Sequence, residues 1–246
     1  MLFYHMFVMT KNLWLRHSTP VVVVKNRFIN FRHTHSGHGG GAATNKYGKE
    51  FENKTSNEGR LLRDGFIKTS FVVVTPRTSY KKIEKRKHQY YLSKTVQNTT
   101  TVFLTQNNFK TYMKMKYRID VFRCPDEAYI ICNNNAAACG GANTIAVKIL
   151  EKKEQRVEGS VETKLWSGPS LKREYSLVLG SRFCVDYAFC VNNFLQNKIT
   201  PPTPHHKYTI LNTILAENNI AVLFGDEPDY FEKLCVWYGD VSPLTP

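Results

Sequence analysis

The chain has 246 residues, of which 42% are hydrophobic, and a formal net charge of +14. That apolar content excludes a chain without a packed core, and the length allows one large domain or an ordinary domain with an extension. The charge is uneven, because residues 1–120 hold 22 Lys and Arg against six Asp and Glu, whereas residues 121–246 hold 12 against 14. This imbalance indicates two regions of different character.

The first region has little regular pattern. The stretch "HTHSGHGGGAATNKYGKEFENKTSNEG" is polar and rich in glycine, which predicts a flexible loop. On either side, "PVVVVKNRFINF" and "GFIKTSFVVVTP" have the β-branched content of strands. The most basic run of the chain, "YKKIEKRKHQ", follows at residues 80–89. We therefore divide the chain into a basic, partly disordered extension, residues 1–87, and a second domain, residues 88–246.

From about residue 90, short apolar runs alternate with turn residues. In "RFCVDYAFCV", for example, Phe183, Val185 and Tyr187 share one face of an extended strand. Strands are predicted in the same way for "KYRIDVF", "NTIAVKILEKK", "RVEGSVETKLW", "REYSLVLG", "HHKYTILNTIL", "NNIAVLF" and "EKLCVWY". Roughly eight to ten closely spaced strands are typical of a barrel or a sandwich. The predicted fold is therefore all-β, an antiparallel up-and-down barrel.

Two segments carry a family resemblance. The end of the chain, "YTILNTILAENNIAVLF" followed by "LCVWYGDVSPLTP", resembles the last strands of arthropod lipocalins, especially the histamine-binding type of ticks. "QYYLSKTVQNTT" is similar to the first strand of that group. The resemblance covers residues 88–246 and implies a secreted, monomeric salivary protein that sequesters a biogenic amine or a lipid in a barrel cavity, without a cofactor and without catalysis.

An eight-stranded barrel has room for one small ligand, and an aromatic lining attracts amines. The candidate ligand-binding side chains are Trp166, Tyr175, Asp186, Tyr187, Tyr208 and Trp237. Asp186, together with Glu174, supplies a carboxylate that would neutralise an amine. The alternative for each aromatic residue is ordinary core packing.

All six cysteines lie in the second half of the chain: Cys124, Cys132, Cys139, Cys184, Cys190 and Cys235. An even number in one region favours disulfides in an oxidising compartment, although buried free thiols are the alternative and the sequence does not select a pairing. The acceptor sequons at Asn53 and Asn98 are consistent with a secreted glycoprotein. The apolar start "MLFYHMFVM" lacks a basic residue ahead of it and a cleavage site, and no run is long enough to span a membrane.

No enzyme motif is evident, and we predict neither a metal nor a catalytic residue. His33, His35 and His38 have the residue type of metal ligands, but their glycine-rich surroundings favour a polar loop. The rival function is polyanion binding. Positive charge and aromatic rings are combined in one segment, so residues 1–120 are the candidate surface for nucleic acid or a glycan. The segment contains Lys81, Lys82, Lys85, Arg86 and Lys87, with Tyr80, Tyr90 and Tyr91.

Overall fold

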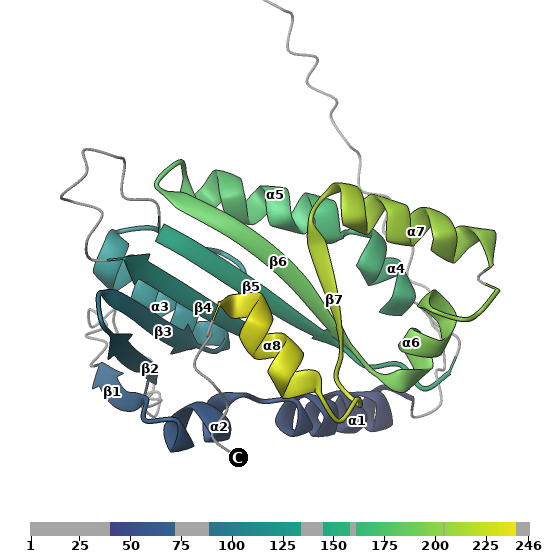
Figure 1. Cartoon of the computed structure of the whole chain (residues 1–246), viewed down its shortest axis with the longest axis horizontal. Coiled ribbons are helices and arrows are strands. Elements are labelled where there is room, and N and C mark those ends of the chain that lie inside the picture. The colour runs from purple at the N-terminus through teal and green to yellow at the C-terminus, as the bar shows by residue number, and fades with distance from the viewer. Residues whose placement is uncertain (1–39, 72–88, 134–144, 158–160, 204, 240–246) are drawn as a thin grey trace, which may run out of the picture. The chain divides into compact units, whose positions relative to one another are not determined.

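The computed structural model describes residues 40–71, 89–133, 145–157, 161–203 and 205–239 (Figure 1). All of them belong to one structural unit, Gly39–Pro246. The predicted strand at residues 20–31, the three histidines, the lysines of the basic run and Cys139 lie outside the described residues.

A seven-stranded sheet forms the centre of this unit, and its strands are neighbours in chain order. The strands are β1 (Ile67–Phe71), β2 (Gln89–Val96), β3 (Thr99–Leu104), β4 (Glu127–Asn133), β5 (Ile145–Lys153), β6 (Phe183–Val191) and β7 (Ile220–Phe224). Strands β1 to β5 are antiparallel, whereas β5, β6 and β7 are parallel. The carboxyl ends of β5, β6 and β7 therefore lie at the same end of the sheet as the amino end of β4.

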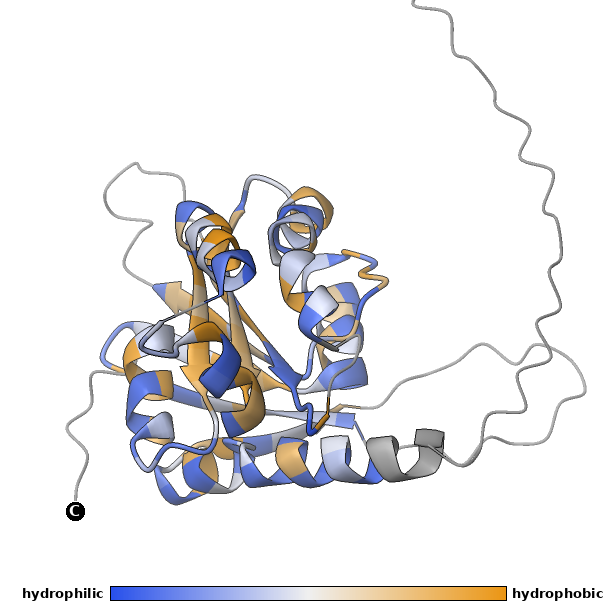
Figure 2. Cartoon of the chain, turned by 90° about the vertical axis from the view of Figure 1, so that its right-hand side faces the viewer, coloured by the Kyte–Doolittle hydropathy of each residue, from blue (hydrophilic) through white to orange (hydrophobic). Residues whose placement is uncertain are grey.

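Helices cover both faces of the sheet. The helices are α1 (Gly40–Lys54), α2 (Glu58–Arg63), α3 (Gln106–Tyr117), α4 (Val161–Trp166), α5 (Gly168–Leu179), α6 (Asn193–Ile199), α7 (His206–Glu217) and α8 (Tyr230–Tyr238). One hydrophobic core lies between one face of the sheet and five helices, α3, α4, α5, α6 and α7. A second core lies between the other face and helices α1, α2 and α8. Figure 2, in which the ribbon is coloured by hydropathy, shows hydrophobic residues along the sheet between these layers. Helical crossovers are what parallel strands require, because a tight turn cannot connect them.

The predicted all-β antiparallel barrel is wrong. The sheet is mixed and open, since β1 and β7 are its two edge strands and do not pair with each other. The strands of the described residues therefore enclose no barrel interior. The strands predicted in "NTIAVKILEKK", "RFCVDYAFCV" and "NNIAVLF" are confirmed as β5, β6 and β7.

The strand predicted in "GFIKTSFVVVTP" is present as β1, and "QYYLSKTVQNTT" contains β2. The other strands predicted in the second domain are helices or loop. "REYSLVLG" belongs to α5, "HHKYTILNTIL" to α7 and "EKLCVWY" to α8, while "RVEGSVETKLW" ends as α4 and "KYRIDVF" begins at the last turn of α3. The buried residues explain the error. Tyr175 and Leu179, like Leu211 and Leu215, are four positions apart. A spacing of four fits both a strand face and a helix face, so it does not by itself distinguish them.

Residues 40–59 also differ from their prediction as a loop. They form α1 and the first residues of α2, and Phe51 and Leu61 of these helices are buried in the second core. A polar helix can be stable when a few apolar residues pack on a sheet, because tertiary packing supplies most of the stability of such helices. Part of the predicted N-terminal extension is thus an integral part of the sheet unit.

Candidate functional site

Charged side chains gather where β4 begins and β5 ends. Along β5, Val147 and Ile149 are buried in the core under α5. Because side chains alternate along a strand, Glu151 and Lys153 continue this face at the strand end. Asp126 immediately precedes β4, whose first residue, Glu127, pairs with Leu150 of β5. The strand pairing therefore brings Asp126 beside Glu151 and Lys153.

An ammonium group bridges the two carboxylates. The Nζ atom of Lys153 lies 2.8 Å from Oε2 of Glu151 and 3.9 Å from Oδ2 of Asp126. The Oδ2 atom of Asp126 also accepts a hydrogen bond of 2.7 Å from the backbone N–H of Lys152. The three side chains are only 16–18% exposed. Such shielding from water strengthens electrostatic interactions between them.

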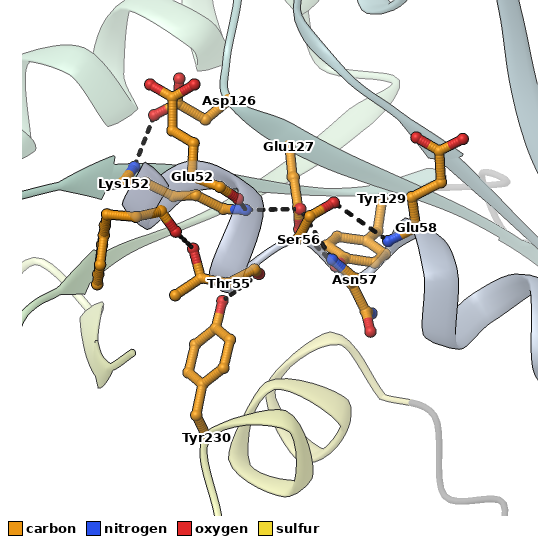
Figure 3. Close-up of polar contacts among 11 residues, drawn as sticks. Glu52, Thr55, Ser56, Asn57, Glu58, Asp126, Glu127, Tyr129, Lys152 and Tyr230 are labelled. Atoms are coloured by element: carbon orange, nitrogen blue, oxygen red, sulfur yellow. Dashed lines mark hydrogen bonds and ion pairs between the residues drawn. The ribbon is translucent and has the colours of Figure 1, made fainter. Parts of the chain in front are cut away.

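A third carboxylate comes from α1. Figure 3 shows the side chain of Glu52 extending from this helix toward Asp126. Burial raises the pKa of Glu52 above 4.5, and the charge of Asp126 raises it further, while Lys152 and Lys153 oppose the rise. The site thus contains Glu52, Asp126, Glu151 and Lys153.

A buried ion pair supports this arrangement from the opposite face of the sheet (Figure 3). Lys152 Nζ donates to Glu127 Oε1 at 2.8 Å and to the carbonyl oxygen of Glu52 at 3.2 Å. The two charged side chains are 3% and 2% exposed. Glu127 also accepts hydrogen bonds from the backbone N–H of Asn57 and the hydroxyl of Tyr129. This network fixes the end of α1, and with it Glu52, to the strand ends.

The donor atoms suit a hard divalent cation. Carboxylate oxygens are the protein ligands of Mg²⁺, which binds through one or two carboxylates and substrate phosphates. Among the described residues, no three His, Cys, Asp or Glu side chains form a ready metal site as they stand. The ammonium of Lys153 instead lies near two of the three carboxylates. Cation binding would thus require Lys153 to give up at least one of these contacts.

The burial of Glu151 predicts that the free energy of unfolding depends on pH. Burial raises the pKa of Glu151 above 4.5, Lys153 opposes this rise, and Asp126 adds to it. A carboxyl group with a raised folded-state pKa binds its proton more tightly in the folded chain than in the unfolded chain. The free energy of unfolding therefore falls as the pH rises from about 4.5 through the raised pKa.

We accordingly expect Glu151→Gln to raise the melting temperature at pH 7, because the variant lacks the buried charge. The difference from the unsubstituted protein should shrink as the pH approaches 4. Thermal unfolding from pH 4 to 8, in the presence of a chelator, measures both effects. A variant less stable than the unsubstituted protein at pH 7 would mean that the Glu151–Lys153 ion pair outweighs the burial of the carboxylate.

The predicted ligand-binding residues do not line one cavity. Tyr175 and Tyr187 lie together in the first core, with ring centroids 6.3 Å apart. Trp166 and Tyr208 pack at the margin of the same core, whereas Trp237 packs on the other face of the sheet, 6.4 Å from the ring of Tyr129. Both predicted acids are paired: Asp186 with Lys148 at 2.8 Å, and Glu174 with Arg123.

Five of the six cysteines and both sequon asparagines lie within the described residues. The five cysteines within the described ranges are free thiols: Cys124, Cys132, Cys184, Cys190 and Cys235. The disulfide prediction is therefore not confirmed for them. Asn53 lies exposed on α1, and Asn98 lies exposed in the turn between β2 and β3. Glycosylation at both positions stays a prediction.

The residues of the site were not identified from the sequence. One signal was present: Pro125-Asp126 precedes an apolar run, and the later run "IAVKIL" ends in Glu151-Lys152-Lys153. The alternation of β5 places Glu151 and Lys153 on the same face as the apolar residues Val147 and Ile149. The proximity of Glu52 had no comparable signal, because it depends on the packing of α1.

The fold and the site together define an α/β protein with a carboxylate–lysine cluster at the end of a mixed sheet. No family model, curated protein or solved structure matches the chain. The lipocalin resemblance, the secreted location and the monomeric state thus stay predictions. No helix in the part of the chain that the structure describes is long and apolar enough to cross a membrane.

Proposed function

We propose that this protein is a divalent-cation-dependent phosphodiesterase that cleaves nucleic acid. The observation that carries the proposal is the shielded cluster of Asp126, Glu151 and Lys153, with Glu52 beside it. A lone carboxylate cluster would repel a phosphate. Carboxylates that hold a cation, with a lysine beside them, would attract one.

The overall charge supports a polymeric substrate. A net charge of +14 favours a long polyanion over a small phosphate ester, because each phosphate contact adds to binding by releasing counterions. This keeps nucleic acid, one of the partners expected from the sequence, and adds a chemical reaction to it. The sequence-based expectation that the chain is not an enzyme rested on the absence of familiar motifs.

Each residue of the site has a distinct role in this proposal. Asp126 and Glu151 would hold the cation, and Glu52 would complete the oxygen donor set. A bound divalent cation would polarise the phosphoryl oxygen and lower the pKa of a water molecule. The ammonium of Lys153 would stabilise the additional negative charge of the transition state, provided that it is within hydrogen-bond distance of the phosphoryl oxygens.

The test is a cleavage assay with labelled single-stranded DNA, duplex DNA and RNA, with Mg²⁺ or Mn²⁺. We expect the protein to cleave at least one of the three, and EDTA to abolish cleavage. Glu52→Gln should lower the rate by about 10-fold, the size of effect seen when support of a metal site is lost. The matched control is Glu232→Gln. Glu232 is exposed on α8, and its substitution removes the same negative charge as Glu52→Gln does.

Binding without cleavage under all these conditions would contradict the proposal and favour a polyanion-binding protein. Equal cleavage in the presence and absence of EDTA would contradict the cation dependence. A steep loss of binding with added salt is expected in either case, because both depend on phosphate contacts.

A further inference from the structure

Two buried hydroxyl groups lack hydrogen-bond partners. Tyr175, on α5, and Tyr187, on β6, are 2% and 0% exposed. Neither hydroxyl oxygen has a partner within the described part of the chain. The rings themselves are well packed, since Tyr175 contacts Phe109 and Tyr187 contacts Phe189. Phenylalanine would fill the same space, so core packing does not explain the hydroxyl groups.

Both tyrosines lie beside the carboxylates of the proposed site. On paired strands β5 and β6, Tyr187 is opposite Ile149, and Glu151 is opposite Phe189. Tyr187 and Glu151 are thus diagonal neighbours on one sheet face, a separation that an aromatic side chain can reach across. Burial raises the pKa of both hydroxyls well above 10, and the negative charge of Glu151 raises it further.

The charged groups around the two rings come from several elements. Glu151 acts on both hydroxyls, Asp126 acts on Tyr187, and Glu174 acts on Tyr175. Arg123 is the cation that opposes these carboxylates at both rings. The two hydroxyls therefore stay protonated next to a negatively charged site, and each can both donate and accept a hydrogen bond.

We propose that Tyr175 and Tyr187 bind the water molecules that hydrate a divalent cation held by Asp126 and Glu151. This inference rests on the proposed function, because it assumes the cation site. Mg²⁺ loses its water ligands reluctantly and keeps several of them in protein sites. Those waters need acceptors for their hydrogens, and two buried hydroxyl oxygens supply them. The tyrosines are positioning residues, since they act through the water shell and the carboxylates.

The choice of cation makes the inference testable. Ca²⁺ takes six to eight oxygen ligands in flexible geometry and depends less on a fixed water shell than Mg²⁺ does. Removal of the hydroxyls should therefore weaken Mg²⁺ binding more than Ca²⁺ binding. A merely structural role of the tyrosines would not produce this difference between two cations of the same charge.

The experiment compares the full-length protein with Tyr175→Phe, Tyr187→Phe and the double variant by isothermal titration calorimetry, using MgCl₂ and CaCl₂ without nucleic acid. The double variant should bind Mg²⁺ at least about 10-fold more weakly, with a change for Ca²⁺ of less than about 3-fold. Its melting temperature should be unchanged or higher, because no unpaired hydroxyl is then buried.

The control is Tyr112→Phe. Tyr112 is a partly buried residue of α3 that packs edge-on against Tyr91 and Tyr117. Burial raises the pKa of Tyr112 to about 12, and Cys132 contributes to this rise. Cys132 lies near the carboxyl end of β4, the end opposite Asp126. Its substitution should leave the affinity for both cations unchanged.

The outcomes separate this inference from the proposed function. If the unsubstituted protein binds Mg²⁺ and the double variant binds it equally well, the inference is overturned and the proposed function survives. An equal loss for Mg²⁺ and Ca²⁺ would also overturn it, because the hydroxyls would then act on the carboxylates rather than on the water shell. If the unsubstituted protein binds neither cation, both proposals fail.

Discussion

Lys153→Met is expected to lower the rate of nucleic acid cleavage by at least about 100-fold, while Mg²⁺ alone binds more tightly than before. The two effects have one origin. The Nζ atom of Lys153 lies 2.8 Å from Glu151 and 3.9 Å from Asp126, where its positive charge competes with a cation for both carboxylates. The same charge is the one proposed to stabilise the transition state, so its loss helps cation binding and harms the chemistry.

The measurements for this prediction are single-turnover cleavage rates and calorimetric titration with MgCl₂. Lys114→Met is the matched control, since Lys114 is 67% exposed on α3 and pairs with an exposed carboxylate. Lys153→Arg should recover part of the cleavage activity, because it keeps the positive charge. If Lys153→Met cleaved at the unsubstituted rate, the role assigned to the lysine would be wrong.

The second large effect concerns stability. Glu127→Ala is expected to lower the free energy of unfolding by about 3–5 kcal/mol, because Lys152 then keeps a buried charge without its partner. Both side chains are almost fully buried, at 3% and 2% exposure. For a protein of this size, the change corresponds to a fall in melting temperature of roughly 6–20 °C.

A double variant distinguishes the ion pair from simple loss of packing. Glu127→Gln combined with Lys152→Met removes both charges and keeps an acceptor for the backbone N–H of Asn57. It should recover most of the lost stability, since a buried ion pair can be replaced by neutral groups at little cost. Urea unfolding of the three proteins measures this. A double variant as unstable as Glu127→Ala would show that the unpaired charge is not the cause.

Part of the fold could be predicted from the sequence. The central strands β5 and β6 combine alternation with β-branched and aromatic residues, and these signals were sufficient to predict them. Helices α5, α7 and α8 were predicted as strands because alternate apolar residues, such as Tyr175, Leu177 and Leu179 in α5, were interpreted as one strand face. Leu177 is exposed whereas Tyr175 and Leu179 are buried, so a helix face and not a strand face packs on the sheet. The buried positions of α8, Tyr230, Leu234 and Tyr238, follow a helical period.

The site was harder to predict than the fold, because its residues are distant in the sequence. Glu52, Asp126 and Glu151 come from α1, the start of β4 and the end of β5. Their proximity follows from the antiparallel pairing of β4 with β5 and from the hydrogen bond that Lys152 donates to the carbonyl oxygen of Glu52. A barrel was expected from residue 88 and a loop around Glu52, so no role was assigned to these residues from the sequence. Tyr175 and Tyr187 were selected from the sequence, though as cavity aromatics.

The most direct test of the cation site is anomalous diffraction from crystals of the protein soaked in MnCl₂. We expect a manganese peak within about 2.6 Å of carboxylate oxygens of both Asp126 and Glu151, with the ammonium of Lys153 displaced from at least one of them. A manganese-soaked crystal in which Lys153 still bridges the two carboxylates, with no anomalous peak beside them, would contradict the proposed site.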